Sequence, residues 1–117
     1  MTYIEMWSYP GGGDEWSSLD LVGFKVEATD GDIGKVDEKS NEVGSDFVVV
    51  DTGPWILGKK VMLPAGLISS IDVSEGKVHV DRTKEEIKNS PELDDDAMRD
   101  VTYRDKLAGY YHPLRRP

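Results

Sequence analysis

The chain has 117 residues, a net charge of −9 and no cysteine. With 38% hydrophobic residues it can supply one compact core, but hardly two. The missing cysteines exclude disulfide scaffolds, thiolate nucleophiles and cysteine-based zinc sites. The 14 basic residues face 23 acidic ones, and no segment is basic, so nucleic acid and anionic membranes are poor partners. We expect a cytoplasmic protein, because no apolar run approaches the about 18 residues of a transmembrane segment and no secretory signal is present.

Residues 1–18 combine four aromatic side chains with Pro10 and three consecutive glycines. They show no periodicity, and the glycine run has maximal backbone freedom. We interpret them as a flexible N-terminal tail. Its aromatic residues Trp7 and Trp16 can still dock on a surface, because tryptophan buries a large area for little lost rotamer freedom.

Residues 19–81 read as short β-type runs separated by turn residues. This spacing is typical of a small barrel or sandwich. Gly34 lies between Ile33 and Val36, which would point to opposite faces of a regular strand, so it indicates a bulge or a close backbone approach. The predicted strands are residues 24–28, 33–38, 46–51, 59–63, 68–73 and 77–80.

The run from Phe47 to Val50 is apolar at every position. A strand with this sequence presents apolar side chains to both faces of its sheet, so both faces must be covered. A six-stranded sheet covers only one of them. Another segment of this chain, or a second chain, has to cover the other.

The last third of the chain supplies a candidate cover. Thr83 and Glu86 have the spacing of a capping box and predict a short helix through about residue 89. After an acidic linker, residues 100–111 predict a second helix. A helix of about 11 residues is marginal alone in water, so it must pack by its apolar stripe, on its own or a neighbouring subunit. The stripe consists of Tyr103, Leu107, Tyr110 and Tyr111.

Motifs that carry chemistry are weak in this sequence. Residues 53–59 satisfy G-x-x-x-x-G-K, but Lys60 stands where a phosphate-binding loop needs Ser or Thr. A calcium loop starting at Asp30 would need an oxygen ligand at Gly34, a glycine at Lys35 and an acidic residue at Asn41, and none of these is present. The two histidines, His79 and His112, lie in no recognisable catalytic constellation. We therefore expect no enzyme, no catalytic residues, no cofactor and no metal site, and read the aspartates at 94–96 as a solvated linker.

Three stretches together resemble a PRC-barrel domain, the family named for the cytoplasmic domain of the H subunit of the photosynthetic reaction centre. They are DGDIGKV at 30–36, FVVVDTGPWILGKKVMLPAGLISSID at 47–72 and VHVDRTKEEIKNSPEL at 78–93. Stand-alone bacterial members are the most similar, and YRDKLAGYY at 103–111 resembles the Tyr-rich tail that often follows their barrel. A similar barrel forms the C-terminal part of the ribosome-maturation factor. The resemblance implies a docking module without catalytic residues.

The resemblance also implies a fold class and a domain plan. The fold is mainly β, a small six-stranded antiparallel barrel with one or two short C-terminal helices. The tail occupies residues 1–18, the PRC-barrel domain residues 19–93, and the acidic linker with the C-terminal helix, which packs on the barrel, residues 94–117.

We predict a non-enzymatic protein-interaction or scaffold module whose partner is a protein, most simply another copy of itself in a homodimer or higher oligomer. Buried Tyr and Trp anchors are favoured in interfaces. The alternative is a sensor domain that binds a small ligand or a cation at the barrel mouth. An enzyme ranks third. The predicted interaction surface consists of Trp55, Tyr103, Leu107, Tyr110 and Tyr111, followed by Trp7 and Trp16.

Overall fold

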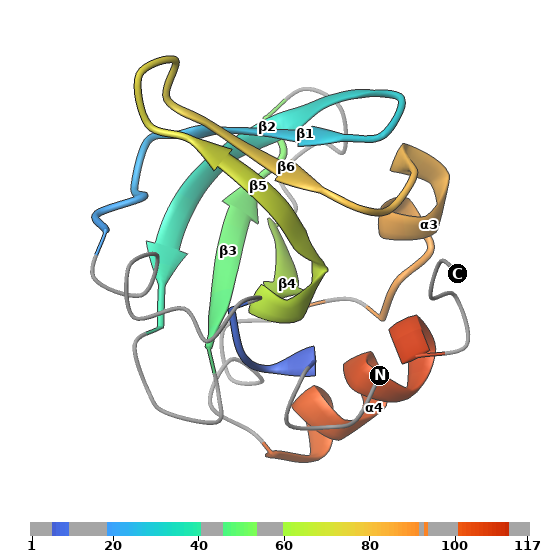
Figure 1. Cartoon of the computed structure of the whole chain (residues 1–117). Helices are drawn as coiled ribbons and strands as arrows, with labels where there is room; N and C mark the ends of the chain where they lie inside the picture. Colours follow the sequence, from blue (N-terminus) through green and yellow to red (C-terminus); the bar gives the residue numbers. More distant parts are fainter. Residues whose placement is uncertain are drawn as a thin grey trace.

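The structure is a computed structural model that describes residues 6–9, 19–40, 46–53, 60–91, 93 and 101–112, the side chain of residue 101 excepted. Six strands and two C-terminal helices follow one another along the chain (Figure 1). No helix in these ranges is long and apolar enough to cross a membrane. The elements are β1 (Lys25–Ala28), β2 (Gly31–Lys39), β3 (Phe47–Asp51), β4 (Lys60–Pro64), the 3-10 turn η2 (Ala65–Leu67), β5 (Ile68–Asp72), β6 (Lys77–Val80), α3 (Lys84–Lys88) and α4 (Val101–Tyr111).

The strands form a single sheet in the order β4-β3-β2-β1-β6-β5. The mainly β class, the six strands and the C-terminal helices are thereby confirmed. Two details of the predicted barrel are corrected. The sheet is mixed, because β1 and β6 run parallel while the other neighbours run antiparallel. The sheet also does not close, because β4 and β5 end the order and are joined by η2. It curls strongly instead (Figure 1).

At Gly34 the structure has both the bulge and the close backbone approach that the sequence indicates. Val26 pairs with Gly34 and Glu27 with Asp32, which leaves Ile33 as the extra residue of a bulge on β2. The bulge lets Ile33 and Val36 both reach the core, where they are buried. A Cβ on Gly34 would lie 2.0 Å from the Asp51 carbonyl oxygen. Only a glycine allows β2 to approach the end of β3 this closely.

The apolar run of β3 is covered on both faces, as its sequence demands. All four side chains from Phe47 to Val50 are buried, although alternation along a strand points them to opposite faces. Residues 6–9 supply part of the cover and lie between the sheet and α4 (Figure 1). The Trp7 ring packs edge-on against Phe47 with centroids 6.4 Å apart, and the Trp7 carbonyl accepts the Asp46 amide at 3.0 Å.

The prediction of a flexible tail is therefore wrong for its described part. Met6, Trp7 and Tyr9 belong to the same core cluster as β3, and Trp7 is fully buried. Large apolar side chains next to an uncovered sheet face gain more from burial than the backbone loses in freedom. The rest of residues 1–18 and the predicted acidic linker at 94–96 lie outside the described residues, so the domain boundaries stay predictions.

Helix α3 begins as predicted. The Thr83 hydroxyl accepts the Glu86 amide at 3.1 Å, and the Glu86 carboxylate accepts the Thr83 amide at 2.9 Å, which completes the capping box. Helix α4 is attached to this region by three hydrogen bonds, one of which runs from the Tyr103 hydroxyl to the Pro91 carbonyl at 3.0 Å. The Tyr110 hydroxyl donates to the Glu86 carbonyl at 2.6 Å, and the buried Arg82 guanidinium donates to the Tyr111 carbonyl at 3.5 Å. A cation at the C-terminal end of a helix also favours the helix dipole.

Candidate functional site

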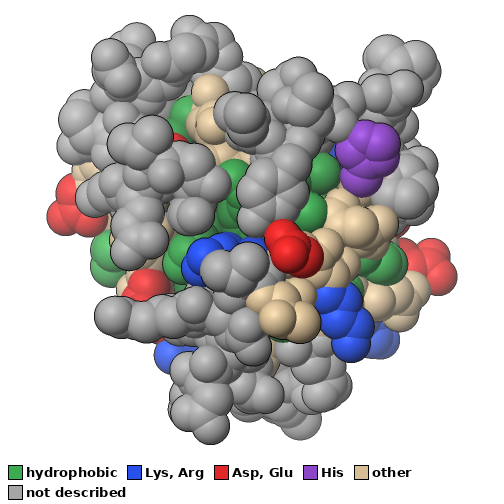
Figure 2. All heavy atoms as spheres, turned by 90° about the horizontal axis from the view of Figure 1, so that it is seen from below, with side chains coloured by type: hydrophobic (Ala, Val, Ile, Leu, Met, Phe, Trp, Pro, Cys, Tyr) green, Lys and Arg blue, Asp and Glu red, His purple; other side chains and the backbone are tan. Residues whose placement is uncertain are grey.

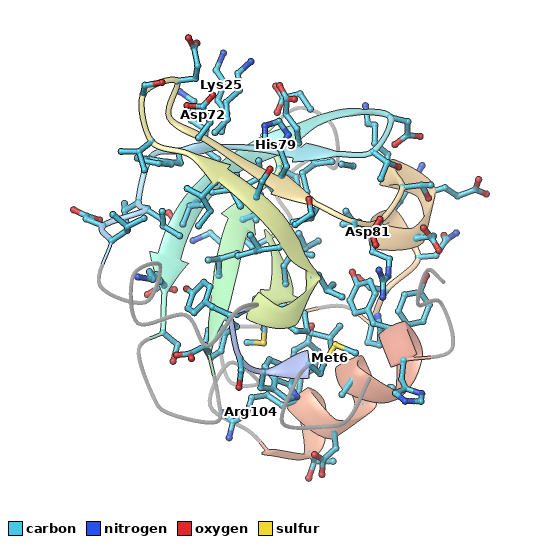
Figure 3. All side chains as sticks on the ribbon, in the orientation of Figure 1. Met6, Lys25, Asp72, His79, Asp81 and Arg104 are labelled. Carbon is cyan, nitrogen blue, oxygen red and sulfur yellow. The ribbon has the colours of Figure 1, made fainter. Side chains whose placement is uncertain are left out.

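A row of charged side chains crosses the whole sheet at one level. Cross-strand pairing places Lys60 of β4 beside Asp51, Asp51 beside Lys35, Lys35 beside Lys25, Lys25 beside Lys77, and Lys77 beside Asp72. We call these six residues the lysine row. It carries two more positive than negative charges, although the whole chain has a net charge of −9. Figure 3 shows Lys25 and Asp72 at the end of the molecule opposite α4, which carries Arg104.

The lysines at the two ends of the row have acidic partners. Lys60 Nζ lies 2.8 Å from Asp37 Oδ2, and this hydrogen bond raises the pKa of the lysine above its usual value. Lys77 Nζ lies 3.5 Å from Glu27 Oε1. Asp72 accepts the Glu75 amide and the Ser74 hydroxyl, which lowers the pKa of its carboxyl.

The two lysines in the middle of the row differ from those at its ends. Neither Lys25 nor Lys35 forms an ion pair with another residue of the described ranges. Lys25 has a lysine on each side, at Lys35 and at Lys77. Directly opposed side chains of one face have Cβ atoms about 5 Å apart, and like charges at that spacing destabilise a sheet. Lys25 is therefore repelled from both sides, although Asp51 stands opposite Lys35 and Glu27 pairs with Lys77.

A cavity of about 360 Å³ opens beside Lys25 and Lys35. Ile33, itself buried, contributes to its wall. The remaining lining is Asp32, Gly34, Asp51, Thr52 and Gly53.

Both carboxylates that line the cavity are bound to their own backbone turns. Asp32 Oδ1 accepts the Gly34 amide at 3.0 Å, and Asp51 Oδ1 accepts the Gly53 amide at 2.9 Å. These bonds belong to short local turns. They occupy one oxygen of each carboxylate.

The sheet end that carries the lysine row also exposes two valines. Val22 precedes β1 and is 54% exposed, and Val73 follows β5 and is 58% exposed. The segment leading into β1 and the β5–β6 connection lie on the same side of the molecule (Figure 1). Exposed apolar residues beside charged ones are the composition of a small interface.

His79 lies one level further along the same face, beside Glu27. Its Nδ1 is 3.7 Å from Glu27 Oε2, and Figure 3 shows it on the outer side of β6. Ser70 stands opposite His79 on β5, but among the described residues no hydroxyl is hydrogen-bonded to the imidazole, as the nucleophile of a catalytic triad would be. Likewise, no three His, Asp or Glu side chains that the structure describes are grouped to hold a metal ion.

Five of the residues predicted to form an interaction surface lie away from the lysine row. Tyr103, Leu107, Tyr111 and Trp7 are buried within the chain itself, and Tyr110 is half-buried. The stripe of α4 therefore packs on its own subunit, one of the two alternatives that its sequence left open.

Figure 2 shows the side of the molecule seen from below, where hydrophobic side chains lie in the middle between charged ones. Trp55 and Trp16 lie outside the described residues.

The lysine row was missed because it depends on strand register. Its lysines are far apart in sequence and look like ordinary solvated charges. The available signal was positional, since each of Lys25, Lys60 and Lys77 stands at the first residue of a strand. Without the β1–β6 pairing, nothing in the sequence places Lys77 beside Lys25.

No protein-family model and no curated protein matches the chain. Among solved structures, the chain is similar to a putative 16S ribosomal RNA processing protein RimM from Pseudomonas aeruginosa, at 25% sequence identity and a TM-score of 0.47. The match covers 60% of this chain and 49% of that chain, so the chain spans about half the length of that protein.

Proposed function

We propose that the chain is a non-enzymatic docking module, as its PRC-barrel resemblance implies, and that it binds a protein partner through the lysine row and the two valines beside it. One observation carries this proposal. Lys25 lies between Lys35 and Lys77, while neither Lys25 nor Lys35 has an ion pair in the described part of an otherwise acidic chain. An arrangement that costs stability in the free protein is typical of a functional surface.

A protein partner fits this surface better than a nucleic acid. The row has four lysines with two aspartates between and beside them, whereas binding along a phosphate backbone needs basic clusters uninterrupted by carboxylates. The net charge of −9 also repels a polyanion at long range. A protein surface of mixed charge meets neither obstacle.

A small-ligand sensor is the second candidate, and the cavity beside Lys25 supports it. Its volume of about 360 Å³ lies at the lower end of the range of ligand pockets. The cation version of this candidate has no supporting cluster in the described ranges.

Site-specific photo-crosslinking in cells tests the docking proposal. A photoreactive phenylalanine analogue is placed at Val73, next to the lysine row, and as a matched control at Lys88, an exposed position on α3. We expect one discrete adduct from position 73 that is missing from position 88. An adduct of twice the chain mass identifies self-association, and light scattering on the purified protein then reports the oligomer. The same pattern from both positions, or none from position 73, contradicts the proposal.

A further inference from the structure

The cavity beside the lysine row suggests what the partner presents. Lys25 and Lys35 both line one cavity, and neither forms an ion pair with a described residue. When a carboxylate reaches a lysine ammonium group and displaces the water around it, the two form a charge-assisted hydrogen bond. We infer that this cavity receives one carboxylate side chain of the partner, a glutamate in particular. This inference rests on the docking function proposed above.

The charge of the lining does not select a doubly charged group. Lys25 and Lys35 are balanced by Asp32 and Asp51, so the lining has no net charge. The two carboxylates keep their unbound oxygens at the site after their turn bonds are made. For a phosphate with nearly two negative charges, the attraction to the two lysines and the repulsion from the two aspartates both double. The neutral lining therefore gives phosphate no electrostatic advantage over a carboxylate.

The shape of the lining favours a carboxylate on an apolar stem. Ile33 supplies an apolar wall, and Gly34, without a side chain, leaves the backbone of β2 directly against the end of β3. A glutamate side chain carries two methylene groups that can contact Ile33 while its carboxylate lies between the ammonium groups. Burying such methylenes adds to the binding free energy, whereas free inorganic phosphate has no such stem.

An NMR titration of the full chain tests the inference. The probe is the blocked peptide acetyl-Ala-Glu-Ala-amide, and its matched control is acetyl-Ala-Gln-Ala-amide, which has the same shape without the charge. The reporters are the backbone amides of Gly34, Thr52 and Gly53, which line the cavity. We expect saturable shifts with the glutamate peptide, a dissociation constant in the millimolar range, and at least about tenfold weaker binding of the glutamine peptide.

Two double variants locate the binding. Lys25→Gln with Lys35→Gln removes the shifts, whereas Lys88→Gln with Lys106→Gln, on exposed positions of α3 and α4, leaves them unchanged. All four positions are exposed, so both variants fold. High salt weakens the binding, because exposed charges are screened.

Several outcomes overturn the inference. They are equal binding of the two peptides, tighter binding of inorganic phosphate or of a single-stranded RNA oligonucleotide than of the glutamate peptide, and the absence of any saturable shift. The two proposals fail separately. A partner crosslinked from position 73 without glutamate binding defeats only the inference, and glutamate binding without a crosslinked partner defeats only the docking function.

Discussion

Replacing Trp7 by alanine tests whether residues 6–9 belong to the core. Trp7 is fully buried and packs against Phe47, which begins the strand whose two faces must both be covered. Its carbonyl bond to the Asp46 amide survives the substitution, because the backbone is unchanged. Trp7→Ala therefore removes the indole ring alone and leaves a cavity against β3.

The expected loss is about 4 kcal/mol in the free energy of unfolding. Burial of an indole removes roughly 200 Å² from water, which at about 25 cal/mol per Å² corresponds to about 5 kcal/mol as an upper bound. Measured truncations of buried aromatic residues cost about 3–5 kcal/mol. A domain of this size is stable by about 5–15 kcal/mol, so the variant stays folded with a much smaller reserve.

Equilibrium unfolding in urea, followed by circular dichroism, measures this loss. Val22→Ala is the matched control, because Val22 is 54% exposed and its truncation costs at most about 0.5 kcal/mol. The slope of the unfolding transition should stay the same in both variants. A loss below about 1 kcal/mol for Trp7→Ala would refute the packing of residues 6–9 and restore the flexible tail.

Three further predictions concern the backbone, a helix cap and pH. Gly34→Ala should cost about 3 kcal/mol or more in the same assay, because the new Cβ would meet the Asp51 carbonyl at 2.0 Å; Gly53→Ala, with open space around it, should cost only about 1 kcal/mol. Thr83→Ala should cost about 1 kcal/mol by removing the cap of α3, and Thr83→Ser should restore most of it. Burial raises the pKa of Tyr9 well above its usual value, so the folded state keeps its phenol proton while the unfolded state loses it above about pH 10. The free energy of unfolding must therefore fall as the pH rises past that value. Tyr9→Phe should move the midpoint of alkaline unfolding to higher pH. It should cost no stability at pH 7, because the Tyr9 hydroxyl has no hydrogen-bond partner in the described ranges.

Local features of this fold could be predicted from the sequence because their causes are local. The capping box needs only Thr83 and Glu86 at a fixed spacing. The bulge follows from Ile33 and Val36, which must both reach the core, with a glycine between them. The strand boundaries differ from the predicted ones by two residues at most, because turn residues mark the ends of each run.

The features that the sequence did not predict depend on which segments meet. The parallel pairing of β1 with β6 joins residues about fifty positions apart, and no turn signal encodes it. The burial of residues 6–9 was missed because glycine-rich surroundings outweighed Met6 and Trp7, although two large apolar side chains so close together were a usable signal. The lysine row could not be predicted at all without the register of all six strands.

The two halves of the sheet follow one rule with opposite outcomes. In the β3–β4 half, apolar side chains on both faces need a cover, and the chain supplies it from residues 6–9 and α4. In the β2-β1-β6 part, Lys25 lies between Lys35 and Lys77 and needs compensating charge. Asp51 stands opposite Lys35 and Glu27 pairs with Lys77, but no described residue forms an ion pair with Lys25. The chain has 23 acidic residues, so a carboxylate beside Lys25 would require no unusual substitution. We explain the missing ion pair of Lys25 by a partner that supplies the carboxylate when it binds.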